Sequence, residues 1–212
     1  MDFIKEIQEI VKKELCSVNS CHDWEHTERV YNLAMHIGKI EKADLEVLAL
    51  ASLLHDVGRK AEEETKGKID HALKGSEMAR EILEKYGLNE KKIQKICHCI
   101  ETHRSRANRI PESLEAKILY DSDKLDSIGA IGIGRIFSFA GHIGAKVHNK
   151  GVNLNEVEEY SLDDTAWREW ELKLKHVFSR IYTDEGKRIA KERHEFMEGF
   201  FDRLNKEVDG EL

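Results

Sequence analysis

The run Leu53-Leu54-His55-Asp56-Val57-Gly58 places a histidine and a carboxylate at the end of a strongly apolar stretch. From Val47 to Leu54 the only polar side chain is Ser52, which predicts a buried helix. An ionised carboxylate in such surroundings costs on the order of several kcal/mol unless a strong partner compensates. A divalent cation is such a partner, and the closing glycine of the run is typical of a helix end. The stretch therefore predicts a metal site built on His55 and Asp56.

Length and composition favour a chain rich in long helices that forms one domain over residues 1–212. With 35% charged residues and a single proline, the chain is suited to long helices with solvated faces. We expect a metal-site core at about 20–140 and C-terminal helices at about 160–208 that pack on it. The apolar stripes of residues 163–204 suit either a monomer core or a homodimer interface.

Charge and hydropathy exclude several classes of partner. The formal net charge of −7 argues against general binding to nucleic acid or to an anionic membrane. No apolar stretch approaches the roughly 20 residues that a membrane span requires. The N-terminal residues are acidic and amphipathic and do not resemble an export signal, so a cytoplasmic location is the expectation.

Apolar residues at helical spacing predict most of the secondary structure. Residues 59–69 are charged and predict a loop or a frayed segment, and residues 142–154 predict an exposed loop. Ser76 is a plausible cap for a helix that ends near Gly87, and Pro111 is expected to open another. The glycine-rich run 129–134 predicts close helix packing or a flexible turn, because it lacks the order of a nucleotide-binding loop. The remaining predicted helices are 2–15, 24–40, 44–57, 89–103 and 163–208, the last with a break at 183–186.

Two further histidines share a face with apolar stripes. The stripe of residues 30–37, extended back by one turn, reaches His26, so His26 should face the interior. Taken alone, a buried histidine bonded to a backbone carbonyl is the simpler interpretation of that position. His103 falls on the inner stripe of the helix at 89–103, whereas His98 lies beside it and is expected as often at the surface. We treat His22-Asp23, in a polar stretch, as a decoy or as support for the ligands.

The cluster Asp121-Ser122-Asp123-Lys124-Leu125-Asp126 is a further source of carboxylates. Because apolar residues flank it on both sides, a ligand donor is favoured over a solvated turn. Periodicity alone does not decide between Asp121 and Asp123, since the two lie on opposite faces of the predicted helix. Both candidates stay open at this point.

The cysteines are expected to be free thiols. Cys16, Cys21, Cys97 and Cys99 include no C-x-x-C pair, and the usual spacings of zinc sites are absent. The alternative interpretation is a structural zinc site that Cys97-His98-Cys99 forms with Cys16, Cys21 or His22.

The order His26, then His55-Asp56, then an aspartate in 121–126 resembles the HD-domain superfamily of metal-dependent phosphohydrolases. It is most similar to the small stand-alone bacterial and archaeal members. A lone His-Asp pair is a weak signal, but here several pieces occur in the same order as in the family, and together they span nearly the whole chain. The similar pieces are residues 22–30, 53–58, 121–134 and 183–197.

The resemblance implies an all-α fold, an HD-domain helical bundle with additional C-terminal helices, and one bound divalent cation. It implies His26, His55, Asp56 and Asp123 as metal ligands. Asp123 is chosen because the family's last ligand precedes a basic or bulky residue, which matches Lys124. The donor set suits Mn²⁺, Fe²⁺, Co²⁺, Ni²⁺, Zn²⁺ or Mg²⁺.

The implied activity is hydrolysis of a phosphoester or pyrophosphate bond in a small phosphorylated metabolite, with a nucleotide favoured. A bound cation would lower the pKa of water towards neutrality and neutralise phosphate oxygens. Candidate catalytic residues are Asp56, His71, His103 and Lys124. His71 and His103 are expected as a second shell of metal ligands, as a general acid or as donors to a phosphate oxygen.

Positive charge must be supplied locally for a phosphate, because the chain as a whole is acidic. Arg59, Lys60 and Lys124 are the candidate substrate contacts. The same run Gly58-Arg59-Lys60 departs from other branches of the superfamily, which place an acidic general base there, so the base stays unassigned. A non-catalytic nucleotide-binding or sensor module that retains the metal pocket is the alternative function.

Overall fold

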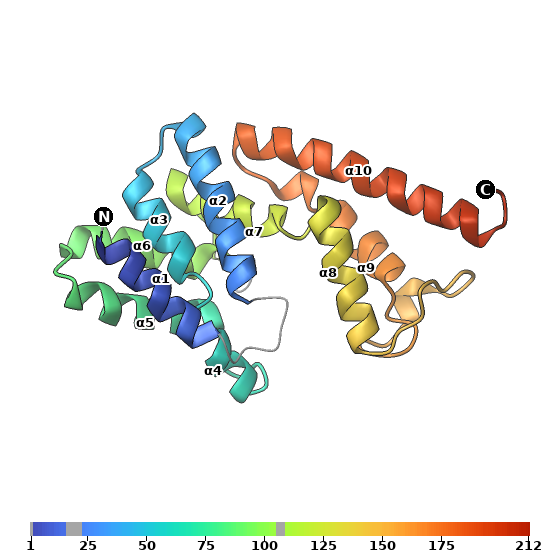
Figure 1. The fold of residues 1–212 in the computed structure, drawn as a ribbon, viewed down its shortest axis with the longest axis horizontal. Coiled ribbons are helices and arrows are strands. Elements are labelled where there is room, and N and C mark those ends of the chain that lie inside the picture. Colours follow the sequence, from blue (N-terminus) through green and yellow to red (C-terminus); the bar gives the residue numbers. More distant parts are fainter. Residues whose placement is uncertain (1, 16–22, 105–108) are drawn as a thin grey trace. The chain divides into compact units, whose positions relative to one another are not determined.

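The computed structural model describes residues 2–15, 23–104 and 109–212 (Figure 1), and every regular element among them is a helix. The predicted all-α class is therefore confirmed. No helix in these ranges is long and apolar enough to cross a membrane. Cys16, Cys21 and His22 lie outside the described residues. The α-helices in order are α1 (Asp2–Leu15), α2 (Trp24–Glu41), α3 (Leu45–Leu54), α4 (Arg59–Glu64), α5 (His71–Lys85), α6 (Glu90–Thr102), α7 (Leu114–Leu125), α8 (Gly129–His142), α9 (Ala166–Leu172) and α10 (Asp184–Val208).

The described residues form two compact units. The first unit comprises the described part of Met1–Asp123 together with Tyr182–Glu185, and the second comprises Lys124–Ile181 and Gly186–Leu212. Helices α7 and α10 each contribute residues to both units. The expectation of one domain over the whole chain stays a prediction.

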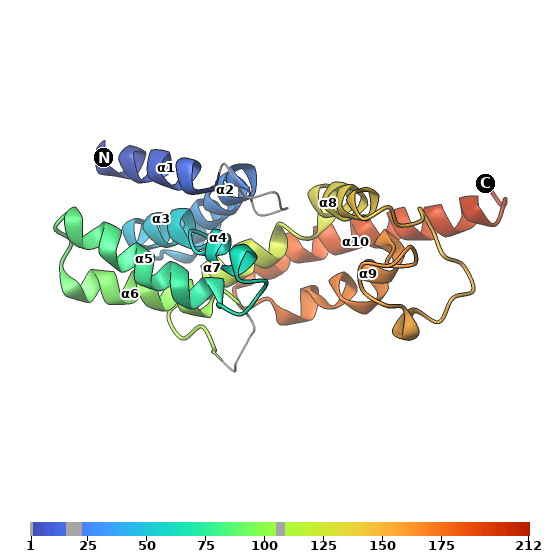
Figure 2. The same cartoon turned by 90° about the horizontal axis from the view of Figure 1, so that it is seen from below.

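The first unit is built around α3, which is buried from Val47 to Leu54. A helix that is apolar on all sides is stable only when other helices surround it. Helix α3 packs against α1, α2, α5 and α6, and Figure 2 shows α1 on one side of it and α5 with α6 on the other. Asp44 caps its start by accepting hydrogen bonds from the backbone N–H groups of Glu46 and Val47 at 3.1 and 3.2 Å. This helix is the support on which the His55-Asp56 pair is placed.

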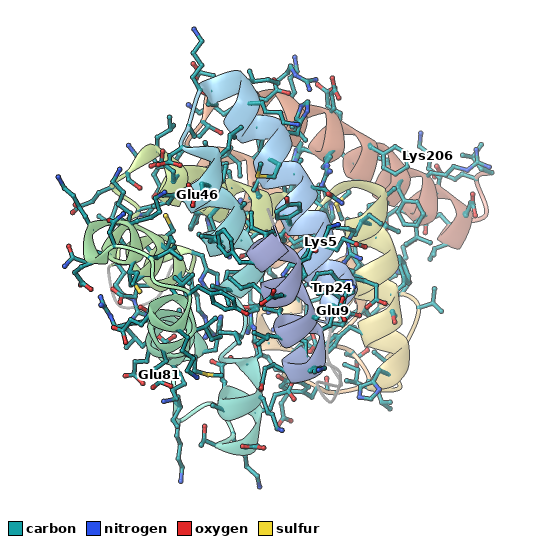
Figure 3. The ribbon with its side chains drawn as sticks, turned by 60° about the vertical axis from the view of Figure 1, so that its left-hand side comes forward. Lys5, Glu9, Trp24, Glu46, Glu81 and Lys206 are labelled. Atoms are coloured by element: carbon teal, nitrogen blue, oxygen red, sulfur yellow. The ribbon has the colours of Figure 1, made fainter. Side chains whose placement is uncertain are left out.

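Helix α1 shows the amphipathic pattern that the sequence predicts. Ile7 and Val11 are fully buried, whereas Lys5 and Glu9 are exposed on its outer face (Figure 3). At the end of the helix the Lys12 ammonium lies 4.8 Å from the ring centroid of Trp24 at the start of α2. The contact ties the two helices together on the solvent side.

Three predicted boundaries were wrong. In α5 and α7 a residue other than the predicted one accepts from the first backbone N–H groups, whereas α4 starts after Gly58 without a side-chain cap. Helix α5 starts at His71 under an Asp70 cap, and Ser76 instead donates to Glu101 at 2.7 Å. Helix α7 starts at Leu114, after Ser113 accepts from the Ala116 N–H, and Pro111 precedes it. The charged stretch after Gly58 forms the short helix α4 over Arg59–Glu64.

The second unit contains α8, α9 and most of α10. The predicted continuous helix from residue 163 is interrupted, because 3-10 turns at Leu174–His176 and Phe178–Arg180 follow α9. Trp170 and Phe201 stack in its core with ring centroids 5.4 Å apart. At Gly132 a Cβ would lie 2.3 Å from the carbonyl oxygen of Ser127, in the turn before α8, so this position has no room for a side chain.

Candidate metal centre

The His55-Asp56 pair lies in the turn that follows the last residue of α3. His55 is fully buried and Asp56 is 1% exposed. The turn is pressed against the start of α5, because a Cβ on Gly58 would lie 2.4 Å from the His71 carbonyl oxygen and 2.6 Å from the Gly75 nitrogen. A glycine is therefore required here for close approach of two backbones. The contact brings His71 to the aspartate.

Helices α2 and α7 bring two further predicted ligands to the pair. His26, in the first turn of α2, is fully buried, and Asp123 is 9% exposed. The His26 Nε2 atom lies 3.4 Å from the His55 Nε2 and 3.4 Å from the Asp123 Oδ1. The Asp56 Oδ2 lies 3.5 Å from the His55 Nε2. We call His26, His55, Asp123 and the Asp56 Oδ2 the first ligand group.

Asp56 also faces a second set of imidazoles with its other oxygen. The Asp56 Oδ1 lies 3.3 Å from the His71 Nε2 and 3.6 Å from the His103 Nε2. The two imidazole nitrogens are 3.2 Å apart. We call His71, His103 and the Asp56 Oδ1 the second ligand group. The structure thus brings both predicted catalytic histidines into contact with the predicted ligands.

The proton positions of two imidazoles follow from their outer nitrogens. The Nδ1 of His55 lies 2.7 Å from the Ser52 carbonyl oxygen, and the Nδ1 of His103 lies 2.6 Å from that of Ile100. A carbonyl only accepts, so Nδ1 must carry the proton in each ring. Each Nε2 atom then presents a lone pair to the cluster. Such an outer hydrogen bond is how metal-binding histidines are oriented.

His71 is oriented by a carboxylate that the sequence analysis did not single out. Its Nδ1 lies 2.8 Å from the Glu62 Oε2 and 2.9 Å from the Arg104 Nη1, while that Nη1 donates to the Glu62 Oε1 at 2.6 Å. We assign the proton to the His71 Nδ1, because the Glu62 carboxylate can only accept, whereas the Arg104 Nη1 already has a closer acceptor in the Glu62 Oε1 at 2.6 Å. Burial raises the pKa of Glu62, but Arg104 and His71 more than offset this and hold it below its usual value. Glu62 lies in a run of three glutamates, and nothing in the sequence distinguishes it from its neighbours.

Burial keeps two of the imidazoles uncharged at neutral pH. It lowers the pKa of His55 to about 4 and that of His71 to about 3, and the carboxylate of Asp56 offsets only part of the effect in each case. A neutral imidazole is the form that binds a cation. Lone pairs of several imidazoles and carboxylate oxygens therefore converge on one buried region.

The spacing of these atoms fits a divalent cation. Ligand atoms about 2.1 Å from an ion, with about 100° between them, lie about 3.2 Å apart. The contacts within the two groups run from 3.2 to 3.7 Å. The ligand atoms of His26, His55 and Asp123 lie within 4.8 Å of one another, and so do those of Asp56, His71 and His103. The first group offers two imidazoles and two carboxylates, which suits the transition metals and Mg²⁺ named above.

Asp121 and Asp123, which periodicity did not distinguish, have different surroundings in the structure. Asp121 accepts hydrogen bonds from the backbone N–H groups of Tyr182 and Thr183 at 2.9 and 2.8 Å and from the Thr183 hydroxyl at 2.6 Å. Asp121 thereby fastens the segment before α10 to α7, and Asp123 is the carboxylate that faces the histidines.

The three residues predicted to contact a phosphate do not lie together in the structure. Arg59 donates to the Asp56 Oδ1 at 2.9 Å and to the Glu62 Oε2 at 3.2 Å. Lys60 is exposed on α4, and Lys124 belongs to the second unit. Substrate roles for all three stay predictions. His98 accepts from the Glu112 N–H at 3.2 Å, outside both ligand groups.

Cys97 and Cys99 of α6 form no zinc-binding group among the described residues, and Cys16, Cys21 and His22, with which such a site was predicted, lie outside them. Cys97 and Cys99 are both free and buried, and the Cys97 thiol lies 3.6 Å from the Ser76 carbonyl oxygen. Burial raises the pKa of Cys99 to about 12, which keeps it protonated. Among the described residues neither cysteine belongs to a group of metal-ligand type.

Comparison with known proteins identifies relatives over the whole chain. The family model of the HD domain matches residues 23–128. The uncharacterized protein YpgQ of Bacillus subtilis (strain 168) is 32% identical over 210 residues, which cover 97% of this chain and 94% of YpgQ.

Solved structures share the fold over nearly the same range. The crystal structure of YpgQ in complex with ADP aligns with a TM-score of 0.73 and 28% identity over 96% of this chain and 94% of that one. The structure of an HD-superfamily hydrolase from Bacillus thuringiensis aligns with a TM-score of 0.78 and 26% identity over 98% and 97%. The similarity thus includes α8 to α10 as well as the helices that carry the ligand groups.

Proposed function

This chain belongs to the HD-domain family, and we propose that it is a metal-dependent phosphohydrolase acting on a small phosphorylated metabolite. A nucleotide is the favoured substrate, and the bond hydrolysed is a phosphoester or a pyrophosphate. One observation carries the proposal: the buried convergence of His26, His55, Asp56 and Asp123, with contacts of 3.4 and 3.5 Å between their ligand atoms. The ADP complex of YpgQ supports the choice of a nucleotide.

The first ligand group would hold the divalent cation. Its two imidazoles and two carboxylate oxygens supply four donors, and neutral His55 can bind without first losing a proton. A cation there would activate a water molecule for attack and neutralise charge on the phosphate. Asp56 uses one oxygen towards each group, so it connects the cation site with His71 and His103.

The geometry favours one subset of the roles expected for His71 and His103. A general acid, or a donor to a phosphate oxygen, needs a proton on the Nε2 that faces the cluster. Both rings carry their proton on Nδ1, towards Glu62 and the Ile100 carbonyl. The unprotonated Nε2 atoms therefore suit a metal ligand or a proton acceptor. Other branches of the superfamily have an acidic residue just after the His-Asp pair, where this chain has Arg59 and Lys60. Here Glu62 supplies a carboxylate next to His71 instead.

The test combines metal analysis with a turnover screen. Purified protein is analysed for bound metal and then assayed for phosphate and pyrophosphate release from nucleotides and sugar phosphates with Mn²⁺, Co²⁺, Ni²⁺ and Mg²⁺. Asp56→Ala should abolish both metal content and hydrolysis, whereas Asp202→Ala, exposed on α10, should change neither. An Asp56→Ala variant that hydrolyses nucleotides without metal would contradict the proposal.

The sensor module is distinguished in the same experiment. It predicts tight nucleotide binding and no release of phosphate or pyrophosphate with any of the four metals. A cytoplasmic location and a homodimer stay predictions.

A further inference from the structure

We propose that Arg59 is a built-in counter-charge in the second ligand group and restricts the chain to one divalent cation, held by the first group. The inference rests on the proposed function, because it takes the first group as a cation site. It concerns a different atom, the Asp56 Oδ1, and a residue that the sequence suggested only as a substrate contact.

The guanidinium of Arg59 binds the oxygen that a second cation would need. Its Nε donates to the Asp56 Oδ1 at 2.9 Å, closer than the His71 Nε2 at 3.3 Å or the His103 Nε2 at 3.6 Å. Arg59 is the first residue of α4, and the turn over residues 55–58 folds it back towards Asp56. The positive charge of Arg59 therefore lies next to the Asp56 Oδ1, the oxygen that also faces His71 and His103.

A second contact holds this guanidinium in place. The Arg59 Nη1 donates to the Glu62 Oε2 at 3.2 Å, and Glu62 is itself held by Arg104 at 2.6 Å. The side chain of Arg59 is 15% exposed. An arginine guanidinium is not deprotonated in proteins, so this charge is permanent.

A divalent cation in the second group would lie very close to this charge. Both would bind the Asp56 Oδ1, the cation at about 2.1 Å and the guanidinium nitrogen at 2.9 Å, so the two charges would be within about 5 Å. Buried charges are screened little by salt. Repulsion therefore makes the inward position of Arg59 and occupancy of the second group mutually exclusive. The first group is affected less, because it binds through the Asp56 Oδ2 and Asp123.

Counting bound Mn²⁺ in charge variants tests the proposal. Wild type, Arg59→Met, Arg59→Lys and the control Arg80→Met are saturated with Mn²⁺ and freed of excess, and bound metal is measured by mass spectrometry and by electron paramagnetic resonance. Arg80 is a suitable control because it forms exposed ion pairs with Glu84 and Glu90. We expect one uncoupled Mn²⁺ in wild type, Arg59→Lys and Arg80→Met. Arg59→Met should bind two spin-coupled ions, the second at least tenfold tighter than in wild type.

Two results would overturn the inference: two ions in wild type, or a single ion in a folded Arg59→Met variant at saturating Mn²⁺. Circular dichroism establishes folding, and Arg59→Gln, which keeps a hydrogen-bond donor but no charge, replaces the methionine variant if that one fails to fold. Failure of the proposed function gives a different result. If the first ligand group does not hold the cation, His55→Ala leaves Mn²⁺ binding unchanged.

Discussion

Both units bury charged side chains, but the network around Arg168 in the second unit matches donors with acceptors, whereas the first ligand group in the first unit brings acceptors together. Arg168 donates to the Asp164 Oδ1 at 2.7 Å and to the carbonyl oxygens of Leu154 and Val157 at 3.2 Å each. In the first ligand group the imidazoles of His26 and His55 face each other and the carboxylate oxygens of Asp56 and Asp123. A buried network with matched partners stabilises a fold, whereas converging acceptors require a cation. The difference separates a structural network from a functional site.

The largest expected effect is on the matched network. Asp164→Ala leaves the Arg168 guanidinium buried without its carboxylate, which should lower the free energy of unfolding by about 3–5 kcal/mol. Urea denaturation measures it. Lys175→Ala, which removes the exposed ion pair with Glu171, should change the free energy by less than about 1 kcal/mol. Equal effects of the two variants would show that the network of Arg168 is not structural.

Metal addition should stabilise the first unit by a comparable amount. A cation that binds only the folded state adds about 2.7 kcal/mol when its concentration is a hundredfold above Kd. Thermal unfolding with and without Mn²⁺ measures the gain. Asp123→Asn should lose it, whereas Asp163→Asn, outside the cluster, should keep it. Stabilisation that persists in Asp123→Asn would place the cation elsewhere.

Acid should weaken the metal-free first unit through its neutral histidines. The folded-state pKa of His55 is about 4, below the unfolded value of 6.5, so the unfolded chain takes up the proton first as the pH falls. Stability is complete above pH 6.5 and declines below it, by about 2 kcal/mol for His55 between pH 6.5 and 5. Urea unfolding across this range measures the slope. His55→Gln should show a shallower slope, and an unchanged slope would contradict the assignment.

Loss of the support behind His71 should have the smallest effect. Glu62→Gln removes the ion pair with Arg104 and weakens the hold on the His71 Nδ1. We expect about a tenfold loss of nucleotide hydrolysis, in line with other residues that orient metal-site histidines. Glu63→Gln, the exposed neighbour, is the matched control. Equal activities of the two variants would show that Glu62 has no part in the site.

The sequence contained most of the fold and part of the site, and the limits have physical causes. Helical phase places His26 in the interior, because one face of α2 is buried. The same argument does not separate Asp121 from Asp123, because both faces of α7 are buried there. Resemblance to the family favoured Asp123, and the structure shows that Asp121 binds Thr183 instead.

Glu62 and the inward position of Arg59 were not predictable from sequence. Both depend on the turn over residues 55–58 and on α4, which the charge pattern presented as a loop. The contact of Arg104 with Glu62 joins residues far apart in the chain. Tertiary contacts of this kind leave no periodic signal.

The most direct test of the central account is anomalous scattering from a Mn²⁺-soaked crystal, recorded at the manganese absorption edge. The account predicts a peak bounded by His26, His55, Asp56 and Asp123, and none between His71 and His103 while Arg59 is present. A crystal whose first ligand group shows no anomalous peak at saturating Mn²⁺ would contradict it.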